Sequence, residues 1–224
     1  MEQIDARPRL VIATAGAEPR VMAPGKDLEQ TAAYQAVAIL DAWTSLYALG
    51  VDARLDLLTA WMRTVALCKP RAQGGQALIL GESDPSLVQA LMTWHPDLLA
   101  AAELADRAQT GLPPTVALAS LWGNRQAVSW AIGQLGANLD GDMGLLEVAG
   151  EQMPSLMGPV PIAPQSNLAV KPLEGTGDRV RALVRVPVAQ RDELALRLHR
   201  IISTYMASRG RSELRFCMDP KDLT

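Results

Sequence analysis

The sequence has 224 residues, of which 49% are hydrophobic and 20% are charged, with a net charge of −3. This balance excludes a disordered chain, and no apolar run approaches the ~18 residues that would cross a bilayer. The charge is uneven along the chain: residues 1–150 carry 10 basic and 16 acidic side chains, and residues 151–224 carry 11 and 8.

The first apolar run, residues 10–17, is short and lacks the positively charged leader that a secretory signal needs. We expect a buried strand over residues 10–16 instead. The two cysteines, Cys68 and Cys217, lie far apart in no motif, which is typical of a protein from a reducing compartment. The sequence therefore predicts a cytoplasmic protein without membrane contact.

Two helical patterns follow, at residues 27–49 and 52–69, each with an apolar stripe at helical spacing. Gly50 is suited to end the first helix, and Pro70 ends the second. We expect these helices to pack antiparallel as a hairpin.

The middle of the chain also indicates mostly helix. A short buried strand is expected at residues 77–80, after which Asp84 can cap a helix that has Pro85 in its first turn. Pro96 should divide the following stretch into two helices. Beyond it, Pro113 and Pro114 open a segment expected to be helical to about Leu135, and a further short helix is expected over residues 145–153.

Proline-rich residues 154–172 have no helical period and predict an extended linker. Beyond it, residues 180–188 alternate as a strand does, residues 190–208 have helical spacing, and residues 214–218 alternate again. The sequence thus predicts an α+β fold, mainly α: a helical body over residues 1–153, the linker, and a small strand–helix–strand unit over residues 173–224.

No motif establishes catalysis or metal binding. Ser83 lies in a strand–turn–helix context resembling a nucleophile elbow, but Pro85 stands where that motif needs glycine. Asp140, Asp142 and Glu151 match three positions of a calcium loop but lack its glycine and one oxygen ligand. We therefore expect an ordinary loop at each place, with no catalytic residue, no metal site and no cofactor.

All five tryptophans fall in the part predicted to be helical: Trp43, Trp61, Trp94, Trp122 and Trp130. Trp122 and Trp130 are eight residues apart, which would place them on one helix face. Tryptophan is enriched at protein interfaces, although core packing is the more common use of such a residue.

Residues 179–215 hold nine arginines against three acidic residues and no lysine. If Val184 and Phe216 point inward, three of these arginines share the opposite sheet face and are candidate binding residues: Arg181, Arg185 and Arg215. This face could bind nucleic acid, dock an acidic protein, or pack on the acidic amino-terminal part. A solvated or internally paired face is the more ordinary alternative. The predicted face offers no aromatic for base stacking, which counts against recognition in the manner of an RNA-recognition motif.

Three functions remain open from the sequence. The leading hypothesis is a non-enzymatic subunit or adaptor of an intracellular, bacterial multi-protein assembly with protein partners. The second is an accessory nucleic-acid-binding protein that uses the arginine face. The third is an enzyme with an unrecognised active site, for which Ser83 with a histidine is the starting point.

Overall fold

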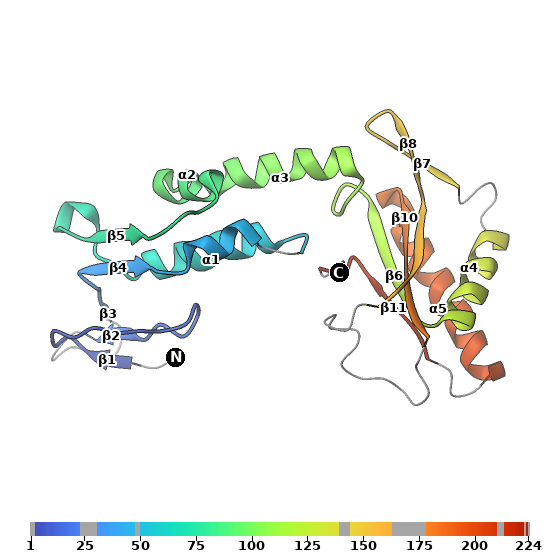
Figure 1. The fold of residues 1–224 in the computed structure, drawn as a ribbon, viewed down its shortest axis with the longest axis horizontal. Coiled ribbons are helices and arrows are strands. Elements are labelled where there is room, and N and C mark those ends of the chain that lie inside the picture. The colour runs from blue at the N-terminus through green and yellow to red at the C-terminus, as the bar shows by residue number, and fades with distance from the viewer. Residues whose placement is uncertain are drawn as a thin grey trace. The chain divides into compact units, whose positions relative to one another are not determined.

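The computed structural model describes residues 3–22, 31–47, 50–138, 144–162, 178–209, 213–221 and 223. The chain divides into two compact units, Met1–Ala101 and Ala102–Thr224 (Figure 1). Within the described ranges, no helix is both long enough and apolar enough to cross a membrane.

The first unit contains two small sheets with helices packed beside them. Its elements are β1 (Gln3–Asp5), β2 (Arg20–Met22), β3 (Thr31–Ala32), β4 (Ala36–Ile39), η1 (Ala42–Tyr47), α1 (Ala53–Val65), η2 (Arg71–Gln73), β5 (Gln76–Ile79), α2 (Pro85–Thr93) and the start of α3 (Pro96–Thr110). One sheet has the order β1–β2–β3, and β4 pairs with β5 in parallel. The unit's core includes Ile39, Leu58, Trp61, Leu87 and Leu99, all of which are buried.

The predicted helical hairpin of the first unit is wrong in its first half. Residues described between 31 and 47 form β3, β4 and the 3₁₀ helix η1 rather than one continuous α-helix. The alanines of this stretch favour helix, but parallel pairing of β4 with β5 overrides that local preference. The predicted buried strand at residues 10–16 is also wrong. These residues form no strand, and Leu10 and Ile12 are almost fully exposed.

Other predictions for this unit are confirmed. Helix α1 occupies most of the second predicted helix, and α2 and α3 are separated where Pro96 predicted a break. Asp84 caps α2, since its carboxylate accepts a hydrogen bond from Ser86 N at 2.9 Å. Strand β5 lies where a strand was predicted, but its side chains are largely exposed rather than buried.

The second unit is built on a four-stranded antiparallel sheet with the order β11–β6–β10–β9. Its elements are β6 (Ala117–Asn124), α4 (Arg125–Asn138), β7 (Leu145–Val148), β8 (Glu151–Pro154), β9 (Leu156–Pro161), β10 (Arg179–Val186), η4 (Val188–Gln190), α5 (Arg191–Arg209) and β11 (Leu214–Met218). Strands β7 and β8 form a separate hairpin.

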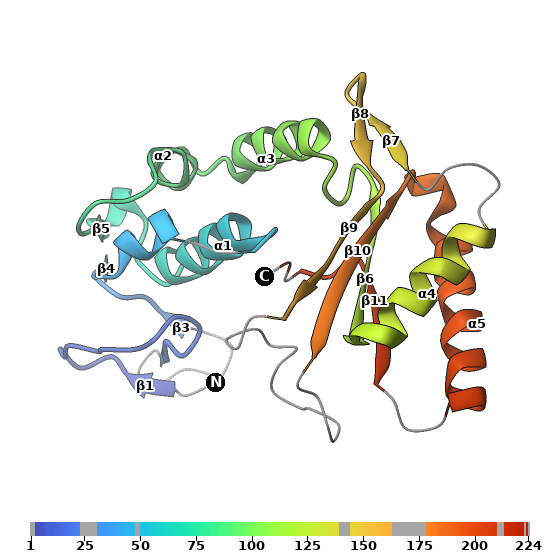
Figure 2. The ribbon, with the colours of Figure 1, turned by 45° about the vertical axis from the view of Figure 1, so that its right-hand side comes forward.

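Helices α4 and α5 cover one face of this sheet (Figure 2). The side chains that meet them come from alternate positions of the strands, because successive residues of a strand point to opposite faces. These residues include Ala119, Leu121, Ala182, Val184 and Leu214. From the helices, Val128, Leu135, Leu194, Leu198 and Tyr205 complete the core.

The predicted fold class, a mainly α protein with a small carboxy-terminal strand–helix–strand unit, is wrong. The final strand, helix and strand are confirmed as β10, α5 and β11, but they belong to a larger sheet. Residues 117–124 form the central strand β6 instead of helix, and residues 145–154 form a hairpin instead of the expected short helix. Strand β6 is covered on both faces along most of its length, so it lacks the alternating pattern that marks a half-exposed strand.

The predicted linker falls partly outside the described residues. Residues 154–162 contribute to β8 and β9, and residues 163–172 are not described. The division of the chain at this linker stays a prediction.

Candidate functional site

The sheet face opposite α4 and α5 carries the three predicted arginines. Strand register places Arg181 across from Trp122, Trp122 across from Arg215, and Arg185 across from Leu118. Directly opposed residues of antiparallel strands project from the same face, and so do residues four apart on one strand. The predicted placement on one face is therefore confirmed, although β6 lies between β10 and β11.

The central row of this face is Arg181, Trp122 and Arg215, on three adjacent strands. Trp122 is half-buried. The predictions that this tryptophan lies on a helix and that the arginine face has no aromatic residue are wrong. One feature of the sequence marks the end of this strand: Asn124 follows Gly123. In the structure α4 begins directly after Asn124, whose Oδ1 accepts a hydrogen bond from Gln126 N at 3.0 Å. Asparagine is a preferred residue at a helix start.

Arg215 is exposed at the end of this row and forms no ion pair with any described residue. Arg181 is half-buried, and its guanidinium donates to the carbonyl oxygen of Leu223. Arg181 and Arg215 thus lie on either side of Trp122, on the neighbouring strands.

Arg185 has a different environment and is 5% exposed. Its Nη1 donates to the carbonyl oxygens of Thr110 and Gly111 at 3.0 and 3.3 Å, and its Nη2 donates to Pro154 O at 2.7 Å. Burial lowers the pKa of Arg185 from its ordinary value. The guanidinium thus joins β10 to the end of α3 and to the end of β8, which indicates a structural role rather than a binding one.

An ion pair closes the other end of the face. Arg179 Nε donates to Glu213 Oε2 at 2.7 Å, and Arg179 Nη2 donates to Glu213 Oε1 at 2.9 Å. Both side chains are buried, with 9% and 2% of their surfaces exposed. The pair spans β6 between β10 and the residue before β11, so this carboxylate is neutralised within the sheet.

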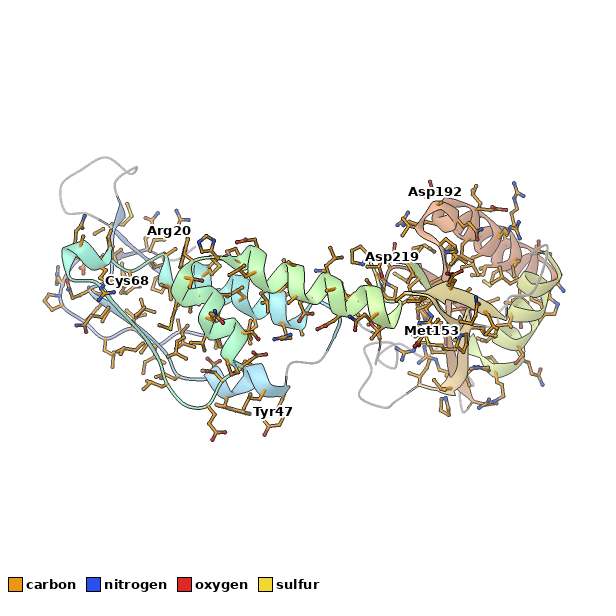
Figure 3. The ribbon with its side chains drawn as sticks, turned by 90° about the horizontal axis from the view of Figure 1, so that it is seen from above. Arg20, Tyr47, Cys68, Met153, Asp192 and Asp219 are labelled. Atoms are coloured by element: carbon orange, nitrogen blue, oxygen red, sulfur yellow. The ribbon has the colours of Figure 1, made fainter. Side chains whose placement is uncertain are left out.

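Asp219, which is labelled in Figure 3, stabilises the bend that follows β11. Its Oδ1 accepts from Leu118 N at 2.9 Å, its backbone N–H donates to Leu118 O at 2.6 Å, and its Oδ2 accepts from Arg191 Nε at 2.7 Å. These contacts account for the left-handed backbone of this non-glycine residue, whose φ is 45°. Asp219, like Glu213, is therefore already paired with an arginine.

The central row contains two basic residues and no acidic one. The two carboxylates near the face are held by Arg179 and Arg191, Arg181 donates to Leu223 O, and Arg215 forms no ion pair with any described residue. An exposed guanidinium group without an acidic partner, such as that of Arg215, suits the oxygens of phosphates, which it binds through paired N–H donors. The tryptophan between the two basic residues adds a flat apolar surface.

The other sequence candidates gain no support as sites. Around the proposed elbow at Ser83, Asp84 caps α2 and pairs with Arg54 at 2.7 Å, so the turn has a structural explanation. Asp140 and Asp142 lie outside the described residues. Among the residues that the structure describes, no group of three or more His, Cys, Asp or Glu side chains is placed to hold a metal ion.

Comparison with known proteins identifies relatives of this chain. A family model described as the primosomal protein N C-terminal domain matches residues 108–221, which include the whole sheet. The probable replication restart protein PriA of Mycobacterium tuberculosis is 36% identical over 226 residues, covering 97% of this chain and 31% of the relative. The Mycobacterium leprae protein of the same name is 35% identical over 220 residues, covering 97% and 30%. The chain thus spans about a third of the length of these relatives.

Proposed function

The chain belongs to the primosomal protein N C-terminal domain family, and we propose that it is a nucleic-acid-binding component of a bacterial replication-restart assembly. In this proposal it acts in the cytoplasm as a subunit or adaptor and performs no catalysis of its own. Relatives named for replication restart support the setting. The observation that carries the binding role is the row of Arg181, Trp122 and Arg215 on the sheet face opposite α4 and α5.

Arg215 is the main candidate for a phosphate contact, because its side chain is exposed and forms no ion pair with a described residue, whereas Arg181 already donates to Leu223 O. Each phosphate neutralised by a basic side chain releases counterions, so affinity for nucleic acid falls steeply as salt rises. Arg185 has a lesser part in this proposal because carbonyl oxygens already occupy its donors.

The test is the affinity of the full chain for a fluorescent DNA oligonucleotide, measured by anisotropy over a range of salt concentrations. Arg215→Ala should reduce the slope of log affinity against log salt by about 0.7 on single strands, because one phosphate contact is lost. Arg200→Ala is the matched control, since it also removes one charge from an exposed position, on α5. Equal slopes for the wild type and Arg215→Ala would contradict the proposal.

Contact with protein partners is the second part of the proposal. The 3₁₀ helix η1 carries large apolar side chains on the surface, including Trp43, which is 55% exposed, and Tyr47, which is 70% exposed. Their ring centroids are 6.1 Å apart, and the rings meet edge to face. Exposed aromatic pairs of this kind are typical of protein interfaces. Changing Trp43 and Tyr47 to Ser should reduce recovery of replication proteins from a nuclease-treated lysate and leave DNA affinity unchanged. Unchanged recovery would contradict this part.

A further inference from the structure

We propose that the segment after β11 is autoinhibitory: it crosses the candidate binding face and lowers the affinity of that face for nucleic acid until it is displaced. The structure describes residues 219–221 and 223 of this segment, which we call the crossing segment. The inference rests on the proposed nucleic-acid-binding function and adds a means of regulation to it.

Two contacts define the course of the crossing segment. At its start, Asp219 N donates to Leu118 O at 2.6 Å, and Asp219 Oδ1 accepts from Leu118 N at 2.9 Å. Further on, the carbonyl oxygen of Leu223 accepts a hydrogen bond from the guanidinium of Arg181 on β10. Because β6 lies between β11 and β10, the segment crosses β6 to reach Arg181. Figure 2 shows the chain leaving β11 on the side of the sheet away from α4 and α5.

Burial along β6 agrees with a segment in this position. Leu118 and Ser120 alternate with the core alanines of β6, so they project from the same face as Trp122. Leu118 is nevertheless 0% exposed and Ser120 is 2% exposed, whereas Trp122 is half-buried. The crossing segment begins at Leu118 and contributes to this cover. The face is therefore closed where the segment begins and becomes accessible only toward Trp122.

The two ends of the crossing segment are held unequally. Asp219 is fixed by its two hydrogen bonds with Leu118 and by a third from Arg191 Nε at 2.7 Å. Leu223 is half-buried and is held on the face through its carbonyl oxygen. The part near Leu223 can therefore leave the face while Asp219 keeps its place. In this inference Arg181 is a positioning residue that holds the segment, and it is not itself a phosphate contact.

A nucleic-acid strand on the face would meet the segment beside Trp122. Arg181 lies directly across from Trp122, and Arg215 lies on the other side. A strand that contacts Arg215 and extends over Trp122 toward β10 reaches the position of Leu223. The two occupants exclude each other there, so the measured affinity is reduced by the fraction of molecules in which the segment is closed.

The first test shortens the chain so that it stops after Pro220, and measures binding of a fluorescent oligo-dT strand by anisotropy. Asp219 and its contacts remain, and the charges removed with Lys221 and Asp222 cancel. The shortened chain should bind about 10-fold more tightly, the effect of removing one hydrogen bond to a charged group that closes the face. Lys221→Ala is the control: it removes a positive charge from the segment, keeps Leu223, and should not raise the affinity. A shortened chain that melts as the wild type does and binds no more tightly would overturn the inference.

Arg181→Ala in the full chain tests the residue that holds the segment. It should raise the affinity for oligo-dT, although less than the shortening does, because a positive charge is lost as well. A phosphate contact predicts the opposite sign. Weaker binding by Arg181→Ala, comparable to that of Arg215→Ala, would therefore overturn the role of Arg181 in holding the segment.

NMR of the unmodified chain provides a measurement that does not depend on how the variants fold. As oligo-dT is added, the backbone amide of Leu223 should shift and its ¹⁵N heteronuclear NOE should fall, while the amide of Asp219 keeps its NOE. Binding that leaves Leu223 unaffected would overturn the inference while the proposed function stands. If neither the full nor the shortened chain binds oligo-dT in a salt-dependent manner, the proposed function fails and this inference fails with it.

Discussion

Arg179 and Glu213 face each other across β6 and form two hydrogen bonds, at 2.7 and 2.9 Å, with both side chains buried. The pair closes one end of the open sheet face and joins β10 to the entry of β11. It also removes from that face a carboxylate that would repel phosphate. Sheet stability and the charge of the site therefore depend on the same contact.

Breaking this pair from one side should destabilise the second unit. Arg179→Ala leaves the Glu213 carboxylate buried without its partner, and we expect a loss of about 3–5 kcal/mol in the free energy of unfolding. Urea denaturation followed by circular dichroism measures this loss. The control is Asp178→Ala, which breaks the exposed pair with Arg125 and should cost less than about 1 kcal/mol. Similar losses for both variants would contradict a buried, structural pair.

Arg185→Ala should lower stability and should not act selectively on nucleic-acid binding. The change leaves the carbonyl oxygens of Thr110, Gly111 and Pro154 without this donor, at a cost of about 2–4 kcal/mol. Thermal unfolding and DNA affinity, measured on the same preparation, separate the two effects. A variant that melts as the wild type does but loses DNA binding would reassign Arg185 to the binding site.

Ser120 is 2% exposed, and its Oγ has no hydrogen-bond partner among the described residues. A buried hydroxyl without a partner reduces stability, so Ser120→Ala should leave the protein equally stable or raise its stability by about 1 kcal/mol. Chemical denaturation measures the change. A loss greater than about 1 kcal/mol would show that the hydroxyl makes a stabilising hydrogen bond.

Asp84 should make the stability of the first unit depend on pH. Burial raises the pKa of Asp84, but hydrogen bonds from Ser86 and the charge of Arg54 outweigh it, and the pKa is lowered overall. A lowered pKa stabilises the fold above the unfolded value of about 3.9, and this contribution is lost as pH falls through the lower folded value.

Asp84→Ala should therefore cost about 1 kcal/mol at neutral pH through loss of the helix cap. Asp84→Asn keeps a capping oxygen and should cost less. Denaturation at several pH values should show the difference between wild type and Asp84→Asn shrinking below about pH 4. A difference that stays constant down to acid pH would contradict the role of the ionised carboxylate.

The elements that could be predicted from the sequence are those whose own residues carry a clear hydrophobic or capping pattern. Strand β10 alternates Val and Ala with Arg because α4 and α5 cover only one of its faces, so the face on which each residue lies could be predicted. Helix α5 and the Asp84 cap were predictable for similar local reasons.

The parts that were missed depend on distant partners. Strand β4 is short and alanine-containing, and it is a strand because β5, nearly 40 residues later, pairs with it. Strand β6 is nearly continuously apolar, which cannot be distinguished from a buried helix by its period. A helix predicted in place of β6 puts Trp122 on the wrong element, so the central residue of the candidate site could not be predicted.

The central claim, that nucleic acid binds on the row of Arg181, Trp122 and Arg215, can be tested directly by NMR of the tryptophan side chains. The indole N–H signals of the ¹⁵N-labelled chain would be followed as oligo-dT is added, with Trp122 assigned through Trp122→Phe. We predict that the Trp122 signal shifts in proportion to binding, while that of Trp130, on the covered face of the sheet, stays in place. Binding that leaves the Trp122 signal unchanged would contradict the account.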